Sequence, residues 1–470
     1  MSSNTLSRRL FLQRLVAGSA ALAGSAFLPR QAAWAAPAAI PKTLVNLMLY
    51  GGADLRFVFA PDPVSANPAY IMQYWQARRA LYGNYADYAA MYAAQYTTVN
   101  ATENFGIHNS CGWLIAQFNL GNAAIIANTY GSLNRRHDHS QLIVESGDLL
   151  ASRTFVDRDG WGGRVIENLA GAPNVLELSS NVQTFCKGTD SSFRLAQVVH
   201  AQNTREMGLP QADMGSNSSD SNLIRALSAY YNARGVEIES EKPANWPYRK
   251  FFQHHTSIST FGNAIAAQLE STPMPAALAG LNLNSSAFEQ QCRNLFDACQ
   301  VSDILNDRIM SMSYGGWDTH TNQNGRIIGN LGDIMGSNGG LATATNELST
   351  QANDNLVFHL SWDFGRQLAA NGAAGTDHGR GNYTILIGRP LQGGIYGKLF
   401  PDREALPDPG DSQGRTPFEI DGRDINGLTS LEHIWSAHSN WLQAGISGSV
   451  FPGAAGSPIE SGVDLSGLYS

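Results

Sequence analysis

The sequence predicts an α/β domain whose mostly parallel sheet is flanked by helices. Apolar runs typical of buried strands alternate along the chain with segments of helical periodicity. Several of these runs end in glycine and then in Asp or His, as the run over 43–50 does before Asp54. In parallel α/β sheets, ligands bind beyond the carboxyl ends of the strands. The repeated pattern therefore also predicts one site assembled from several strand ends.

The composition is that of a globular protein without a nucleic-acid partner. The chain has 470 residues, of which 43% are hydrophobic and 15% charged, so a sizeable core can be buried. The net charge is -8, and there is no basic stripe to neutralise phosphates. The four cysteines form no C-x-x-C pair, which excludes a zinc ribbon and a thioredoxin-like motif.

The N-terminus has the features of an export signal. Arg8 and Arg9 precede a weakly apolar run over 15–28, and the small residues Ala33 and Ala35 offer a cleavage site. These features predict a twin-arginine signal peptide over 1–35, with an ordinary Sec signal as the alternative. We therefore expect a periplasmic or extracellular protein that meets the twin-arginine translocase during export. No later run is long and apolar enough to predict a membrane span.

The first part of the mature chain supplies two buried strands, over 43–50 and 123–128. Between them, residues 65–100 predict a helix with a loop, and residues 113–120 predict a second helix. The densest polar cluster, over 135–141, follows the second strand and leads into another helix. The aromatic residues of the first helical segment are interpreted as packing groups rather than as a cofactor site; they are Tyr70, Tyr74, Trp75, Tyr82, Tyr85, Tyr88 and Tyr92.

The rest of the chain completes a single domain over 36–470. A short strand over 174–178 precedes a less regular region, 179–305, which we interpret as a helical insertion or cap. A long helix is predicted over 326–351. Three further strands are predicted, over 309–314, 356–362 and 383–388.

Candidate metal ligands follow the predicted strands. They are Asp54, the cluster that holds His137 and His139, Asp318 with His320, Asp363, and Asp377 with His378. Carboxylates and histidines without thiols suit zinc, manganese or iron, or calcium where oxygens dominate. Two plainer interpretations stay open: the glycine-rich segment 375–382 as a polar surface loop, and Asp318 as the cap of the helix that follows it.

Five short motifs carry a resemblance to a known family: Gly51-Gly52-Ala53-Asp54, Asn134-Arg135-Arg136-His137, Gly315-Gly316-Trp317-Asp318-Thr319-His320, Phe364-Gly365-Arg366, and Thr376-Asp377-His378-Gly379-Arg380-Gly381-Asn382. The chain resembles the twin-arginine-exported proteins of the domain-of-unknown-function 1501 family over nearly the whole mature length. That family looks like a distant branch of the alkaline phosphatase/sulfatase superfamily, so the resemblance implies an alkaline phosphatase-like fold.

The resemblance also implies metal positions, which we carry over to Asp54, Asp318, His320, Asp377 and His378. This sequence departs from the family pattern twice. Arg136 stands where relatives usually have Ser, and Asp363 stands where they favour Glu. If that Ser is the nucleophile in relatives, this chain lacks it, and Ser140 or Thr129 are the nearby hydroxyls.

The expected function is that of an exported metal-dependent hydrolase of phosphate or sulfate esters, with a small-molecule or polymer ester as substrate. Zinc is the expected divalent metal, with calcium or manganese as alternatives. His137 and His139 are candidate ligands or acid/base groups, and Arg136 and Arg380 are candidates to hold the anion. The alternative is a non-catalytic periplasmic or cell-surface protein that uses the same scaffold for binding or assembly. A metal-dependent isomerase or mutase is not separable from a hydrolase by sequence.

Overall fold

The computed structural model describes residues 41–469, except for 65–67, 84, 100–103, 155–158, 172, 190–197 and most of 207–260. The predicted signal peptide over 1–35 lies outside the described residues, as does a large part of the predicted insertion over 179–305.

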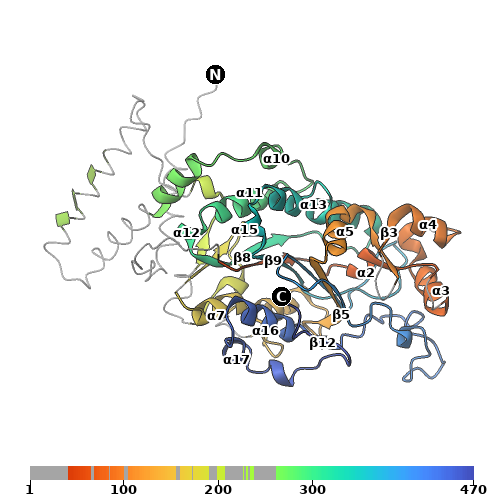
Figure 1. The fold of residues 1–470 in the computed structure, drawn as a ribbon. Helices are drawn as coiled ribbons and strands as arrows, with labels where there is room; N and C mark the ends of the chain where they lie inside the picture. Colours follow the sequence, from red (N-terminus) through yellow and green to blue (C-terminus); the bar gives the residue numbers. More distant parts are fainter. Residues whose placement is uncertain are drawn as a thin grey trace.

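A nine-stranded sheet forms the centre of the molecule (Figure 1). β1 pairs in parallel with β8 and β9, whereas β10 is antiparallel to both β9 and β5. The spatial order is β11 (Gly394–Tyr396), β5 (Ala123–Tyr130), β10 (Asn382–Ile387), β9 (Leu356–Trp362), β1 (Thr43–Leu49), β8 (Asp307–Tyr314), β6 (Asn174–Glu177) and β7 (Val198–His200), with β12 (Thr429–Ser430) paired to β5. The predicted mostly parallel sheet is confirmed, and the architecture is consistent with an alkaline phosphatase-like α/β fold.

Helices flank the sheet on both faces (Figure 1). On one face lie α5 (Gly112–Asn119), α11 (Ser286–Gln300) and α13 (Gln323–Met335), and on the other lie α7 (Trp161–Asn168), α16 (Leu431–Leu442) and α17 (Ser447–Val450). Further helices are α2 (Leu55–Val58), α3 (Pro68–Ala77), α4 (Tyr88–Gln95), α6 (His137–Ser146), α10 (Ala276–Ala279), α12 (Ser302–Leu305), α14 (Gly340–Glu347) and α15 (Thr350–Asn353). Within the described residues, no helix is long and apolar enough to cross a membrane.

A smaller sheet of β2 (Phe59–Pro61), β4 (Phe105–His108) and β3 (Tyr96–Val99) lies near α3 and α4 at one end of the molecule (Figure 1). The aromatic residues of this region largely pack, as predicted: Tyr70, Tyr74, Trp75, Tyr82 and Tyr92 are buried. Tyr85 and Tyr88 differ, because both are exposed.

The single long helix predicted over 326–351 was wrong. The structure divides this stretch into α13, α14 and α15. Gly336 and Gly339 lie at the first break, where glycine lowers the stability of a helix and lets the chain turn. A Cβ on Gly336 would lie 2.5 Å from the Gly332 carbonyl oxygen, so the close turn depends on glycine.

The ends of several strands meet at one edge of the large sheet. Leu49, Tyr314 and Trp362 lie in register at the ends of the parallel strands β1, β8 and β9. β10 starts at the same edge because it runs the other way, and Asn382 at its start is paired with Thr129 of β5. The loops after β1, β8 and β9 and the loop before β10 are therefore neighbours.

Candidate metal centre

Three imidazoles and one carboxylate converge at this edge of the sheet. His137 is the first residue of α6, Asp318 and His320 lie in the loop after β8, and His378 lies in the loop before β10. Ligand atoms of His137, Asp318 and His378 all lie within 4.8 Å of one another. His320 Nε2 lies 3.1 Å from Asp318 Oδ1 and 2.9 Å from His378 Nε2. All four side chains are partly exposed, so the cluster is open to solvent.

Each imidazole is oriented by a hydrogen bond between its Nδ1 atom and an oxygen atom. The Nδ1 partners are Asp363 Oδ2 at 2.6 Å for His137, Asp377 Oδ1 at 2.7 Å for His320, and the Arg135 carbonyl oxygen at 2.9 Å for His378. A carbonyl oxygen only accepts, so the proton of neutral His378 lies on Nδ1 and its Nε2 carries a lone pair. The two carboxylates favour the same tautomer in His137 and His320.

This arrangement fits a bound cation. The Nε2 atoms of His320 and His378 lie only 2.9 Å apart, and their lone pairs repel each other unless a proton or a metal ion lies between them. His137 Nε2 is buried and has no hydrogen-bond partner among the described residues. Histidines oriented by carboxylate and carbonyl groups are the usual arrangement around protein-bound metals. The donor set of imidazole nitrogens and a carboxylate oxygen suits zinc or a related divalent ion.

The charges around the cluster also favour a cation. The hydrogen bond that His137 donates to Asp363 raises the pKa of His137, which means that positive charge is stabilised there. Burial alone would raise the pKa of Asp318, but the hydrogen bond and the positive charge of Arg366 oppose it, and the pKa is lowered to about 2. Asp318 is therefore ionised at neutral pH. Burial lowers the pKa of His378, which keeps this imidazole neutral and able to bind a metal.

Arg366 joins the loops of the site through hydrogen bonds. Its guanidinium is fully buried and donates to the carbonyl oxygens of Gly51, Gly52, Trp317 and Thr376 and, at 2.6 Å, to Asp318 Oδ1. The close approach needs glycine at position 51, where φ is 121° and a Cβ would lie 2.4 Å from the Asp318 amide nitrogen. One side chain thus fixes the loop after β1, the loop after β8 and the loop before β10.

Asp363 and Asp54, two of the predicted ligands, instead have buried supporting positions. Asp363 is fully buried, and its Oδ1 accepts the Gly52 amide at 2.6 Å while its Oδ2 faces His137. Asp54 is paired with Arg78 and accepts a 2.7 Å hydrogen bond from Gln323. Neither is among the described residues whose ligand atoms converge. The predicted ligand Asp377 likewise orients His320.

The structure gives the other predicted site residues partners of their own. Arg380 forms an ion pair with the buried carboxylate of Asp424, with Nη2 at 3.1 Å from Oδ1. Arg136 is exposed and lies 3.4 Å from Asp138. His139 uses Nε2 on the Ala151 carbonyl oxygen at 2.7 Å and Nδ1 on the Asn134 side chain at 3.2 Å. The structure therefore does not bring His139 into the cluster.

The hydroxyl groups named as substitutes for a serine nucleophile are engaged elsewhere. Ser140 is buried and donates to Ser132 at 3.0 Å, and Thr129 is buried and bonded to Thr384 at 2.9 Å. Asn322 rather than Asp318 precedes α13, so the interpretation of Asp318 as the cap of that helix was wrong.

Sequence reasoning missed the supporting residues Arg366, Asp424, Gln323 and Arg78. Arg366 belongs to one of the motifs that carried the family resemblance, but the sequence did not indicate what this residue does. For Asp424 and Gln323 the sequence holds no comparable signal, because both lie in stretches without a motif.

Residues 299–402 match a protein family described as "Protein of unknown function (DUF1501)". The matched segment runs from the end of α11 through β8, β9 and β10, and it contains Asp318, His320, Asp363, Asp377 and His378. His137 lies outside it. No curated protein matches the chain.

Proposed function

We propose that this protein binds a divalent cation, zinc by its ligand chemistry, with Asp318, His137, His378 and His320. We further propose that it is exported by the twin-arginine pathway and hydrolyses phosphate or sulfate esters with this centre. The observation that carries the proposal is the convergence of oriented Nε2 atoms on one ionised carboxylate oxygen. A divalent cation bound there supplies a Lewis acid for an ester oxygen and lowers the pKa of a water molecule.

The chain's own residues suit an anionic ester. Arg135 donates to Asp424 at 3.3 Å, and Arg380 shares the same carboxylate, so two guanidinium groups are held by one acid beside His378. Both guanidiniums are partly exposed, as is that of Arg136. Fixed planar guanidinium groups can donate two hydrogen bonds to a pair of oxygens of a phosphate or sulfate ester. They account for the binding of the anion and not for its cleavage.

His137 is the ligand that Asp363 orients. Its Nδ1 is bonded to Asp363, and its buried Nε2 lies 3.7 Å from Asp318 Oδ1. A carboxylate behind a histidine raises the basicity of Nε2 and so strengthens its bond to a metal ion. Since Ser140 and Thr129 are engaged elsewhere, we infer that water rather than a side-chain hydroxyl attacks the ester.

The first test is the metal content of the protein purified in its exported, folded form, measured by mass spectrometry. We expect about one equivalent of a divalent metal in the wild type and loss of it in His378→Ala. The exposed His200, which bonds to the Ser179 carbonyl oxygen, supplies the matched control, and His200→Gln is expected to keep the metal. Wild-type protein that stays metal-free after reconstitution with zinc, manganese and calcium contradicts the proposed centre.

Hydrolysis is tested separately with p-nitrophenyl phosphate and p-nitrophenyl sulfate. We expect one of them to be cleaved by the metal-loaded protein and not by Asp318→Asn. Metal binding without cleavage of either ester would favour the second candidate, a non-catalytic binding protein on this scaffold. Arg136 at the start of α6, in place of the Ser that the family resemblance implies, is the observation behind that candidate.

A further inference from the structure

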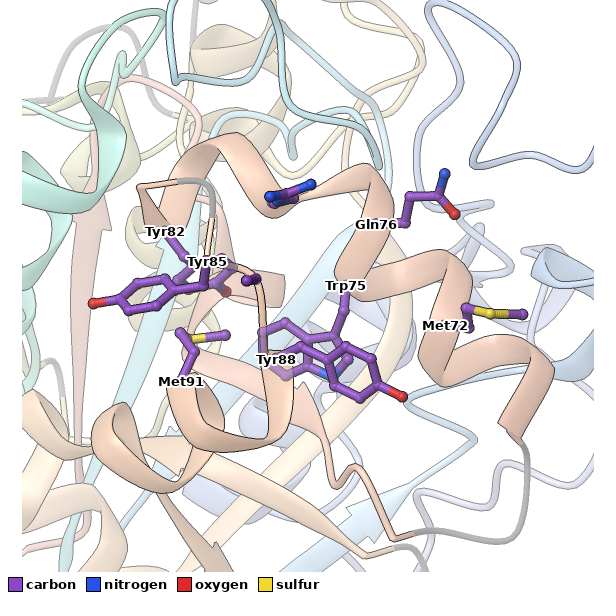
Figure 2. Close-up of a pocket in the computed structure, with 9 residues that line it drawn as sticks. Met72, Trp75, Gln76, Tyr82, Tyr85, Tyr88 and Met91 are labelled. Atoms are coloured by element: carbon purple, nitrogen blue, oxygen red, sulfur yellow. The ribbon is translucent and has the colours of Figure 1, made fainter.

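A concave surface that shares no lining residue with the candidate metal centre lies between α3, the short 3-10 helix over Arg79–Tyr82 and α4 (Figure 2). It is a half-open cavity of about 220 Å³, which is the size of a single-ring ligand. The exposed residues Tyr85 and Tyr88, which departed from the packing prediction, both line it.

The cavity has a buried base and an exposed rim. Trp75 and Tyr82 are 3% and 2% exposed and form the base, whereas Tyr85 and Tyr88 are 49% and 40% exposed. The ring of Tyr88 lies parallel to that of Trp75, with 6.4 Å between centroids and an interplanar angle of 6°. Stacking against a buried indole fixes the orientation of Tyr88 before any ligand arrives. The rim thus presents held aromatic faces to solvent.

The lining combines ring faces with polar groups. Its aliphatic members are Met72, Ala86 and Met91, and each of its aromatic rings carries a hydroxyl or an indole N–H. Trp75 Nε1 is buried and has no hydrogen-bond partner among the described residues, although buried indole N–H groups usually have one. The exposed amide of Gln76 adds a donor and an acceptor at the rim. Such a lining suits a ligand that has both an apolar face and hydroxyl groups at its edge.

The positive charge of Arg79 restricts the class of ligand that the cavity can bind. Aromatic cages that bind quaternary ammonium groups depend on the negative faces of their rings. Here Arg79 is part of the lining and places a positive charge beside those faces, which disfavours a cation. A neutral or anionic ligand is compatible with Arg79.

We propose that this cavity binds one pyranose ring of a neutral or acidic sugar. The C–H face of the sugar stacks on Tyr88 and Tyr85, and its hydroxyl groups bond to the hydroxyls of these two tyrosines and to the Gln76 amide. An acidic sugar adds an ion pair with Arg79. The proposal is independent of the metal centre and of the proposed hydrolysis.

The test is ligand-observed saturation-transfer NMR on the full-length exported protein with four probes. Methyl glucoside and methyl glucuronide represent the proposed class, benzoate represents a flat aromatic anion, and choline represents a cation. We expect a glycoside to bind, and Tyr85→Ala or Tyr88→Ala to weaken it roughly fivefold to tenfold, because each removes one stacking face. Tyr88→Phe, which keeps the ring and removes only the hydroxyl, is expected to lose less than Tyr88→Ala.

Leu120→Ala is the matched control, since Leu120 is 70% exposed and does not line the cavity. It is expected to leave glycoside binding unchanged, and circular dichroism checks that every variant is folded. Tighter binding of benzoate or choline than of both glycosides would overturn the proposed class. Glycoside binding that survives both alanine substitutions would overturn the site, and absence of glycoside binding would overturn the proposal as a whole.

Discussion

Two groups of histidines in this protein have opposite surroundings. His137, His320 and His378 lie at the open edge of the sheet, with every Nδ1 bonded and Asp318 beside their Nε2 atoms. His359 of β9 and His438 of α16 are fully buried, with 4.9 Å between their ring centroids. Both nitrogens of His359 lack a hydrogen-bond partner among the described residues. The same side chain is thus prepared for a cation in one place and kept neutral in the other.

The difference lies in the neighbouring groups. At the sheet edge, carboxylates raise the pKa of His137, and a carboxylate or carbonyl oxygen at Nδ1 fixes the proton of each ring. In the core, burial lowers the pKa of His359 to about 3, and burial lowers that of His438 well below its usual value. A histidine therefore indicates a metal centre only where oriented oxygen atoms surround it.

Of the changes near His137, His320 and His378, removing the guanidinium of Arg366 should have the largest effect on stability. Arg366→Ala leaves four buried carbonyl oxygens and Asp318 without their donor, and we expect the free energy of unfolding to fall by about 3 kcal/mol or more. Urea denaturation measures it. Arg389→Ala is the control, because it breaks an exposed ion pair with Asp354 and should cost less than about 1 kcal/mol. Similar losses for both variants would contradict the role of Arg366 as a clamp.

Asp363→Ala should weaken the centre without removing a converging ligand. It deprives His137 and the Gly52 amide of a buried acceptor, so we expect a loss of about 2 kcal/mol in stability and of about 10- to 100-fold in metal affinity. Competition with a chromogenic chelator measures the affinity. Asp363→Asn retains the shape of the side chain and is expected to lose less stability. Unchanged metal affinity in both variants would show that the carboxylate behind His137 does not support binding.

The buried pair should make the protein sensitive to acid. The pKa of His359 is about 3 in the folded state and near 6.5 in the unfolded chain, so below pH 6.5 the unfolded state binds more protons. Stability is full above pH 6.5 and falls as pH drops towards 3, with His359 contributing about 1.4 kcal/mol per pH unit. We expect His359→Phe to reduce this slope in denaturation curves measured across that range. The exposed His200 again provides the control, and an equal reduction in His200→Gln would refute the assignment.

Arg136→Ser should have the smallest effect. Arg136 precedes α6 and its side chain makes no capping hydrogen bond, whereas Ser is a preferred residue at this position. We expect the free energy of unfolding to rise by about 0.5 to 1 kcal/mol in urea denaturation. Arg136→Ala, which has neither the charge nor a capping oxygen, separates the two causes. A gain that is equal in both variants would point to removal of the arginine and not to the cap.

Much of the fold and part of the site follow from the sequence. The buried strands appear as apolar runs, and the residues after them include Asp318, His320 and, before β10, Asp377 and His378. These were predictable because strand periodicity and turn residues are local properties of the chain. The division of the helix predicted over 326–351 was not foreseen, although Gly336 and Gly339 are visible in the sequence.

The tertiary structure decided which polar groups meet. β10 runs antiparallel to its neighbours and so brings the loop before it, not the loop after it, to the site. Asp54 is paired with Arg78, and Arg380 is held by Asp424. The sequence by itself determined where carboxylates, imidazoles and glycines follow strands. Their partners depend on contacts between segments far apart in the chain, such as Arg366 and Gly51. A buried charged group must be hydrogen-bonded or paired, and the packing of the backbone decides which donor or acceptor lies beside it.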